Sequence, residues 1–340
     1  MTLRTAVIGV GFLGKEHARI HAALAAEDRA QLIAVCDRDE GRARAVAAAR
    51  GTAWVTDWRA LIGRVDAVSL AAPTEAHCEI ACPLLEAGIH VLVEKPVART
   101  LAEADRMIDA ASRSGALLQV GHLERFNPAL VALRPHVKGP LYFEIHRIGQ
   151  FTARSLDIDV VLDLMIHDLD IVQWLVGEDV EVKDVRAVGI PVLTERVDAA
   201  NARLEFANGA VANITASRIG TEKIRKMRFF QPHDYVAVDY AARRASISNL
   251  VPPAASGAWP GVSVQHLEAP DIEPLRAEIE AFLEAIRCGG PSPVSGHDGR
   301  RALALALRAL ERIDEHAAMI ESSKLRVQSS QPVSTLNFGL

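Results

Sequence analysis

Two segments of the sequence combine residue types that can move a proton. In the first, Asp163, His167 and Asp170 are spaced by four and three residues in an otherwise apolar run, so a helix places them on one stripe. A carboxylate one turn from a histidine orients the ring and raises its basicity, which suits a general acid or base. This segment alone leaves three alternatives open: a catalytic pair, an Asp–His pair that ties the helix to a neighbouring strand, and a divalent metal site.

The second segment is Glu94-Lys95-Pro96, which directly follows the apolar run His90–Val93. If that run is a buried parallel strand, Lys95 lies at the carboxyl edge of a sheet, where open α/β folds bind their ligands. Burial and a nearby positive charge would lower the pKa of its ammonium towards the range useful for proton transfer. The alternative is a surface lysine at a turn.

A glycine pattern near the N-terminus indicates a dinucleotide site. Gly9-Val10-Gly11-Phe12-Leu13-Gly14 fits GxGxxG, and it follows an apolar strand-like run and opens a helical segment. Asp37 ends the second expected strand, 23 residues after Gly14, where an acid can bind the adenosine ribose hydroxyls. We therefore predict NAD as the cofactor. Arg38 follows immediately and could pair with a 2′-phosphate, which keeps NADP as an alternative. The expected contacts from this region are Gly9, Gly11, Phe12, Leu13, Gly14, Asp37 and Arg38.

These residues need a scaffold, and the first third of the chain alternates strand and helix patterns. The expected strands are Thr5–Val10, Gln31–Cys36, Ala67–Ala71, His90–Val93 and Leu117–Val120. The expected helices are Phe12–Ala26, Glu40–Arg50, His77–Ala87 and Leu101–Ser114. Such alternation requires parallel strands with right-handed crossovers, hence a doubly wound Rossmann sheet over residues 1–121.

After Gly121 the pattern changes to a series of strands with few helices. The expected strands are Leu141–Ile148, Val180–Ile190, Ala200–Phe206, Ala210–Ser217, Lys223–Phe230 and Tyr235–Ile247, with helices at Leu162–Val176, Glu273–Arg287 and His297–His316. Asn208-Gly209 is a hairpin signal, and Ser295 with Asp298 can cap the last helix. We predict a C-terminal α+β domain with a mainly antiparallel open sheet over residues 122–321, followed by a partly mobile tail at 322–340.

Composition narrows the class of protein. The chain has 340 residues, 49% of them hydrophobic, and a formal net charge of −5, which argues against a nucleic-acid partner. No apolar run approaches membrane-spanning length, and the N-terminus lacks a signal-peptide layout. The four cysteines show no zinc-site spacing and suit a reducing compartment. We therefore expect a cytoplasmic enzyme without a membrane partner or bound metal.

The motifs taken together resemble a known family. GVGFLG, EKP, Gly121-His122 and the Asp163…His167 helix, in this order, resemble the Gfo/Idh/MocA oxidoreductases between Val7 and about Leu310. The resemblance implies hydride exchange between nicotinamide and a sugar or polyol carbon. It implies that His167 removes the hydroxyl proton, that Lys95 stabilises charge at the same oxygen, and that Asp163 positions either group. It also places Pro73, Thr74, His77 and Glu94 near the cofactor.

Within that family, the segments 121–128 and 161–168 look like those of dehydrogenases that act on UDP-N-acetylglucosamine. This likeness implies oxidation of the sugar 3-hydroxyl to a ketone. Candidate substrate contacts are His122, Arg125, Asn127 and Arg154, and Arg147 is a further candidate for the diphosphate. Each arginine has an alternative as an ordinary solvated charge.

Other functions stay open on the sequence. An inositol, polyol or free-sugar dehydrogenase of the same family is one, a non-catalytic NAD-sensing protein is another, and a metal-dependent hydrolase is a third. We also predict a homodimer or homotetramer, on the argument that the small residues Ala200, Ala202, Ala210 and Ala212 would let a second sheet approach.

Overall fold

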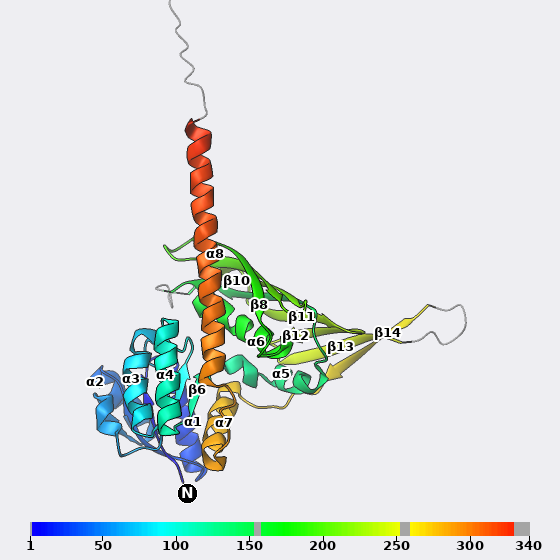
Figure 1. The fold of residues 1–340 in the computed structure, drawn as a ribbon. Coiled ribbons are helices and arrows are strands. Elements are labelled where there is room, and N and C mark those ends of the chain that lie inside the picture. The colour runs from blue at the N-terminus through cyan, green and yellow to red at the C-terminus, as the bar shows by residue number, and fades with distance from the viewer. Residues whose placement is uncertain (1, 153–157, 252–258, 330–340) are drawn as a thin grey trace, which may run out of the picture.

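The computed structural model describes residues 2–152, 158–251 and 259–329. An N-terminal α/β unit and a large open sheet lie beside each other, and a long C-terminal helix runs along both (Figure 1). Among the described residues, no helix combines the length and the apolar composition needed to cross a membrane.

The N-terminal unit is a six-stranded parallel sheet in the order β3-β2-β1-β4-β5-β6, which confirms the predicted Rossmann topology. Its strands are β1 (Arg4–Ile8), β2 (Gln31–Cys36), β3 (Ala53–Val55), β4 (Ala67–Leu70), β5 (His90–Glu94) and β6 (Leu118–Gly121). The strand order reverses between β1 and β4, so the carboxyl ends of these two strands flank the crevice expected for a ligand. β3 was not predicted, because three residues are too few to show a period.

Four helices cover this sheet: α1 (Gly14–Ala26), α2 (Glu40–Arg50), α3 (Thr74–Glu86) and α4 (Leu101–Ser114). Local signals explain their ends. The Asp39 side chain accepts a hydrogen bond from the Arg42 amide at the start of α2, and Thr100 with Glu103 forms a capping box on α4. α3 begins three residues before the expected His77, so Pro73 and Thr74 form its first turn.

The second unit is an eight-stranded sheet in the order β14-β13-β12-β11-β7-β10-β9-β8. Its strands are β7 (Tyr142–Gln150), β8 (Val182–Ile190), β9 (Ala199–Phe206), β10 (Val211–Gly220), β11 (Ile224–Gln231), β12 (Asp234–Asp239), β13 (Arg244–Val251) and β14 (Gly261–Leu267). Only β7 and β10 pair in parallel, which confirms the mainly antiparallel prediction. The Asn208-Gly209 hairpin is confirmed, with Gly209 at a φ of 88°.

Two strand predictions in this sheet were wrong. The segment Tyr235–Ile247 is not one strand but two, because the chain turns before Arg243, whose φ is 54°. β14 was missed altogether. It lies at the sheet edge, and its side chains are mostly exposed, so it carries little of the alternation that marks a buried strand.

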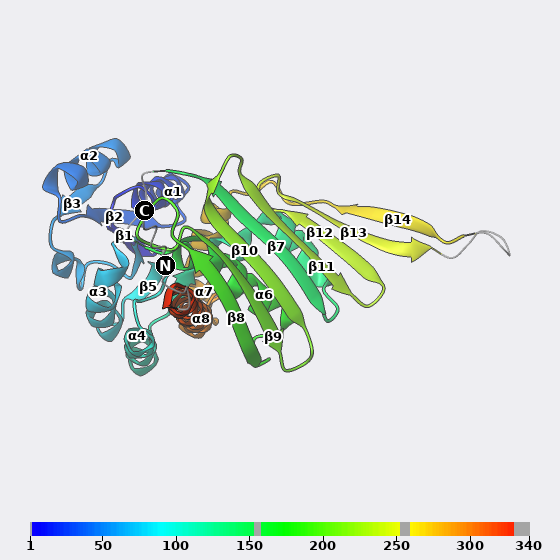
Figure 2. The ribbon, with the colours of Figure 1, turned by 90° about the horizontal axis from the view of Figure 1, so that it is seen from above.

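One face of the large sheet packs on α6 (Ile166–Val176), and the other carries no helix layer in the described chain (Figure 2). Ile214 and Phe143 point towards α6 and are fully buried. The alanines at 200, 202, 210 and 212 lie in this same core, at 0–5% exposure. Our argument that they admit a second sheet was therefore wrong, because they face the protein's own helices.

The last two helices return to the first unit. Leu275, Ile279 and Phe282 of α7 (Pro274–Cys288) pack with Ile20 and Leu24 of α1. The predicted domain boundary at residue 121 stays a prediction. That boundary assigns α7 to the second domain, whereas α7 packs against α1 of the Rossmann unit.

α8 (Gly296–Ser329) is longer than expected. Ser295 caps it as predicted, accepting a hydrogen bond from the Asp298 amide at 3.2 Å. The helix continues to Ser329 and so includes part of the predicted tail. The rest of that tail, 330–340, lies outside the described residues.

Candidate active site

The glycine loop is built for close approach to a phosphate. Gly9 has a φ of +80°, and a Cβ on Gly14 would come within 1.7 Å of the Gly9 carbonyl oxygen. Around Gly11, by contrast, nothing lies within 4 Å of an added Cβ. The loop therefore leaves open space above the N-terminus of α1, whose free amides and dipole favour a pyrophosphate.

The loop opens into a cavity of about 830 Å³, a volume suited to part of a dinucleotide. Predicted cofactor residues that line it are Gly9, Gly11, Phe12, Leu13, Asp37, Arg38 and Pro73. Arg42 and Trp58 also line it and were not predicted, since neither belongs to the glycine motif. The lining combines phosphate-facing backbone, an acid and an apolar wall, as NAD requires.

Asp37 is held in place by the main chain. One carboxylate oxygen accepts a hydrogen bond from the Val10 amide at 3.0 Å, and the other accepts one from the Asp39 amide at 2.9 Å. The Arg42 guanidinium lies 3.3 Å away. Arg42 of α2 is thus the cation that contacts this carboxylate. Arg38, the cation considered from the sequence, lines the same cavity.

His77 is 1% exposed and does not line the cavity. One ring nitrogen lies 3.0 Å from the Pro96 carbonyl oxygen, and the other lies 2.9 Å from that of Ala72. Burial lowers the pKa of His77, so a neutral ring donates one of these bonds at a time. Its role as a direct cofactor contact stays a prediction. What the contacts show is that it links the start of α3 to the loop after Lys95.

Lys95 is the cation that follows β5, and its ammonium meets Asp163. Nζ donates to the main-chain carbonyl oxygen of Asp163 at 2.6 Å and lies 3.4 Å from the Oδ1 of the same residue. Asp163 belongs to η4 (Val161–Met165), a turn of π-helix that precedes α6. Such turns often mark functional sites. Asp163 therefore contacts Lys95, and among the described residues no side-chain hydrogen bond joins it to His167.

Glu94 connects the Lys95 main chain to His17 of α1. It accepts a hydrogen bond from the Lys95 amide at 3.3 Å through one oxygen, and its other oxygen lies 2.9 Å from Nε2 of the buried His17. Although burial would raise the pKa of Glu94, the hydrogen bond from His17 and the charges of His17 and Lys95 lower it overall. The carboxylate stays ionised and holds the strand end rigid.

His167 is the second residue of α6. Its Nδ1 is buried without a hydrogen-bond partner in the structure. Burial and then the positive charges of Lys95 and Arg147 hold the pKa of His167 well below its usual value. The imidazole is therefore neutral at physiological pH.

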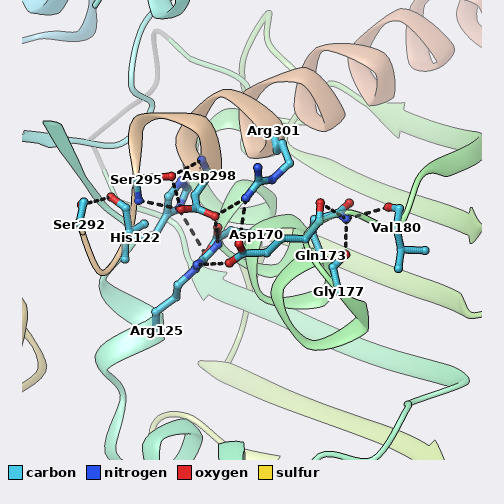
Figure 3. Close-up of polar contacts among 12 residues, drawn as sticks. His122, Arg125, Asp170, Gln173, Gly177, Val180, Ser292, Ser295, Asp298 and Arg301 are labelled. Atoms are coloured by element: carbon cyan, nitrogen blue, oxygen red, sulfur yellow. Dashed lines mark hydrogen bonds and ion pairs between the residues drawn. The ribbon is translucent and has the colours of Figure 1, made fainter. Parts of the chain in front are cut away.

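Arg125 and Asp170 form a buried network rather than an open site (Figure 3). The Arg125 guanidinium donates to both oxygens of Asp170 at 2.9 and 2.7 Å and to Asp298 at 3.1 Å. Arg301 joins the network through Asp298 and Glu178. Because Asp170 is engaged in this way, the metal alternative loses one of its three ligands, and the described residues contain no other cluster arranged for a metal.

The remaining predicted substrate residues lie in different surroundings. His122 is 1% exposed, lies 3.9 Å from Asp170 and has no hydrogen-bond partner on either ring nitrogen in the structure. Asn127 caps α5 (Pro128–Leu133) through the Ala129 amide and donates to Glu124. Arg154 lies outside the described residues. The sugar-binding roles of His122 and Asn127 stay predictions.

Arg147, the other candidate for the diphosphate, is buried at 2% exposure. It donates two hydrogen bonds to Asp168, at 2.6 and 2.8 Å, and one to Glu124 at 2.8 Å. The neighbouring β11 carries Arg225 opposite it. Arg225 was not predicted from the sequence, because only its pairing with Arg147 brings it towards α6, the helix that carries His167.

Comparison with known proteins decides between the remaining classes. Residues 3–122 match the family described as "Oxidoreductase family, NAD-binding Rossmann fold", and residues 135–230 match the "GFO/IDH/MocA C-terminal domain". The chain belongs to the Gfo/Idh/MocA family. This member is therefore an oxidoreductase that uses an NAD-binding Rossmann domain, and Lys95, Asp163 and His167 lie between that domain and the family's second sheet.

Known proteins similar to this one cover at least nine-tenths of the chain. The UDP-N-acetylglucosamine 3-dehydrogenase of Acidithiobacillus ferrooxidans is 41% identical over 90% of this chain and 96% of its own. A solved structure of that enzyme superimposes with a TM-score of 0.86 at 40% identity, covering 93% and 98% of the two chains. The myo-inositol 2-dehydrogenase of Thermotoga maritima is 28% identical over 92% and 97%.

A levoglucosan dehydrogenase in complex with NADH and levoglucosan shares the fold, with a TM-score of 0.80 at 22% identity over 93% of this chain and 98% of that one.

Proposed function

We propose that this enzyme oxidises the 3-hydroxyl of UDP-N-acetylglucosamine to the 3-keto sugar with NAD. The observation that carries the chemistry is the contact of Lys95, which follows a Rossmann strand, with Asp163, four residues before the neutral His167. The 41% identity to the Acidithiobacillus enzyme over nearly the whole chain supports the substrate.

In this reaction the substrate alcohol loses a hydride from carbon and a proton from oxygen. When bound, the nicotinamide supplies the hydride acceptor. Neutral His167 takes the hydroxyl proton, and the Lys95 ammonium stabilises the negative charge that develops on the same oxygen. Asp163 holds Lys95 by its main-chain oxygen and its carboxylate, so the ammonium is already oriented before substrate binds.

A polyol or free-sugar dehydrogenase is the second candidate function. The relatives named for inositol support it, at 28% identity over 92% of the chain for the Thermotoga protein. The chemistry at Lys95 and His167 would be the same for either substrate. The distinction therefore depends on residues that would bind the nucleotide diphosphate.

We further infer that NAD is preferred to NADP, that the protein forms a homo-oligomer and that it acts in the cytoplasm. Asp37 would repel a 2′-phosphate. No described helix covers the outer face of the large sheet, which carries stacked Tyr142 and Phe230 and half-exposed Val188 and would suit a second copy. All four cysteines are free thiols, as a reducing compartment favours. Light scattering tests the oligomer, because a monomeric mass would contradict it.

The function is tested by mixing the purified protein with NAD and, separately, UDP-N-acetylglucosamine, myo-inositol and N-acetylglucosamine, and following the absorbance of NADH. We expect reduction with the nucleotide sugar and its loss in His167→Ala. Reduction only with a free sugar or inositol would keep the oxidoreductase and replace the substrate. Repeating the assay with NADP tests the cofactor preference.

A further inference from the structure

We propose that Arg225, together with Lys223, binds the diphosphate of a nucleoside-diphosphate sugar beside the catalytic groups. The inference rests on the proposed function for the position of the sugar. It deepens that function by naming the residues that would separate a nucleotide sugar from a free sugar or a polyol.

Strand register brings Arg225 to the active site. On β11 it lies directly opposite Arg147 of β7, on the face that packs on α6. The inward-facing pairs along these two strands change from apolar to basic in the order Phe143–Phe229, Ile145–Met227 and Arg147–Arg225. Arg147 binds Asp168, the residue after His167, so the basic end of the row is the end beside the catalytic helix.

The two arginines of this pair differ in how their charges are balanced. Arg147 holds Asp168 and Glu124 by short hydrogen bonds. Among the described carboxylates, Arg225 reaches only that of Glu124, at 3.9 Å, and Glu124 already accepts hydrogen bonds from Arg147 and Asn127. The Arg225 side chain is 36% exposed, so a ligand can reach it. Lys223 is exposed, and no carboxylate of the described chain lies within ion-pair distance of it.

The charges of this pair of cations and of the groups on the neighbouring helix act on one another. The charge of Arg225 helps to lower the pKa of His167, and Asp163 is among the carboxylates that act on Arg225. Burial and then Arg147 lower the pKa of Arg225, and Arg225 in turn lowers that of Lys223. Two neighbouring cations that destabilise each other's charge provide a favourable position for an anion.

A diphosphate fits this position in charge. The reacting hydroxyl must lie at Lys95 and His167, and the diphosphate is attached one sugar ring away from it. The planar guanidinium of Arg225 can bind two phosphate oxygens at once, and Lys223 supplies a point charge beside it. Arg125 and Arg147, which the sequence suggested for this role, are both committed to buried carboxylates.

The test uses the full-length protein saturated with NAD. UDP binding is measured by calorimetry, and NAD reduction is measured with UDP-N-acetylglucosamine. The variants are Arg225→Ala, Lys223→Ala and Arg225→Lys. The matched control is Arg228→Ala, an exposed arginine of the same strand on the opposite face of the sheet. We expect Arg225→Ala to weaken UDP binding and raise KM roughly ten- to a hundredfold, with kcat much less affected. For Lys223→Ala and Arg225→Lys we expect UDP affinities and KM values between those of Arg225→Ala and the wild type. Arg228→Ala should match the wild type in both.

Failure of this inference can be told apart from failure of the proposed function. If the wild type oxidises UDP-N-acetylglucosamine and Arg225→Ala binds UDP as tightly as the control, the subsite is overturned and the function stands. If the wild type binds UDP through Arg225 without oxidising that sugar, the subsite stands and the substrate must be another nucleotide sugar. If the wild type neither oxidises the nucleotide sugar nor binds UDP, both proposals fail.

Discussion

The Lys95 ammonium donates to the main-chain carbonyl oxygen of Asp163 at 2.6 Å, while the carboxylate of Asp163 lies farther away, at 3.4 Å. A lysine from the Rossmann sheet is thus held by the backbone of the helix that carries His167. Since a main-chain oxygen accepts regardless of the side chain, the anchoring of Lys95 depends on the π-helical turn as well as on the identity of residue 163.

From this contact we predict unequal effects of two substitutions. Lys95→Ala removes the charge that we propose stabilises the developing alkoxide and should lower kcat by about 10²- to 10⁴-fold. Asp163→Asn keeps the 2.6 Å bond and loses only the ion pair, so its kcat should fall less. Steady-state kinetics measure both, with NADH binding by fluorescence as the control for folding. Equal losses in the two variants would show that the carboxylate does more than orient Lys95.

The pH dependence should reveal the state of His167. Burial and the charges of Lys95, Arg147, His122 and Arg225 lower its pKa well below 6.5, so the imidazole stays neutral as the solution is acidified. We expect kcat/KM to show no fall with a midpoint near 6.5 between about pH 8 and pH 6. The pH profile of the wild type measures this. An acidic limb centred near 6.5 that disappears in a His167 variant would contradict it.

Asp37 should set the cofactor preference. Asp37→Ser removes the carboxylate from a cavity that Arg38 and Arg42 also line, which leaves two cations for a 2′-phosphate. We expect the KM for NAD to rise roughly tenfold, the value of one charged hydrogen bond, and NADP to become usable. Initial rates with the two cofactors give the ratio. An unchanged ratio would mean that Asp37 does not face the ribose.

Arg125 should matter for stability more than for substrate affinity. Arg125→Ala leaves Asp170 and Asp298 buried without their cation, which should cost about 3 kcal/mol of unfolding free energy. Urea denaturation of wild type and variant measures the loss. A stable variant whose KM for UDP-N-acetylglucosamine rises would instead restore Arg125 as a substrate residue.

Glu278 on α7 predicts a pH-dependent stability. It is fully buried without a hydrogen bond to its carboxyl group in the structure, and burial, with the charge of Glu94, raises its pKa well above 4.5. Above pH 4.5 the folded state therefore holds a proton that the unfolded state releases, so its contribution to stability falls as the pH rises.

Glu278→Gln removes the carboxyl group that binds this proton in the folded state. Its Tm should exceed that of the wild type at about pH 8 and match it near pH 4.5. Glu284→Gln, an exposed acid of the same helix, serves as the control and should bring no such gain. Scanning calorimetry at both pH values tests the pair, and a Glu278→Gln Tm that never exceeds the wild type would contradict the prediction.

Sequence patterns predicted the scaffold because they depend on local chemistry. The glycines at 9, 11 and 14 act through their own backbone and immediate neighbours, and Asn208-Gly209 turns the chain wherever it occurs. Strand and helix periods are likewise short-range, so the two sheets were expected with few errors. The errors fell on β3 and β14, which are too short or too exposed to show a period, and on the turn before Arg243.

The sequence by itself determined the Rossmann fold, the dinucleotide loop and the presence of Lys95, Asp163 and His167. Tertiary structure alone decided which charges meet. In the folded protein Asp163 pairs with Lys95, and Asp168 pairs with Arg147. The positive charge of Arg225 has only a distant partner, Glu124, among the described residues. Ion pairs form between residues far apart in the chain, and their partners depend on strand register and helix placement. The spacing of residues along the sequence therefore cannot distinguish a buried structural arginine from one that is free to bind a substrate.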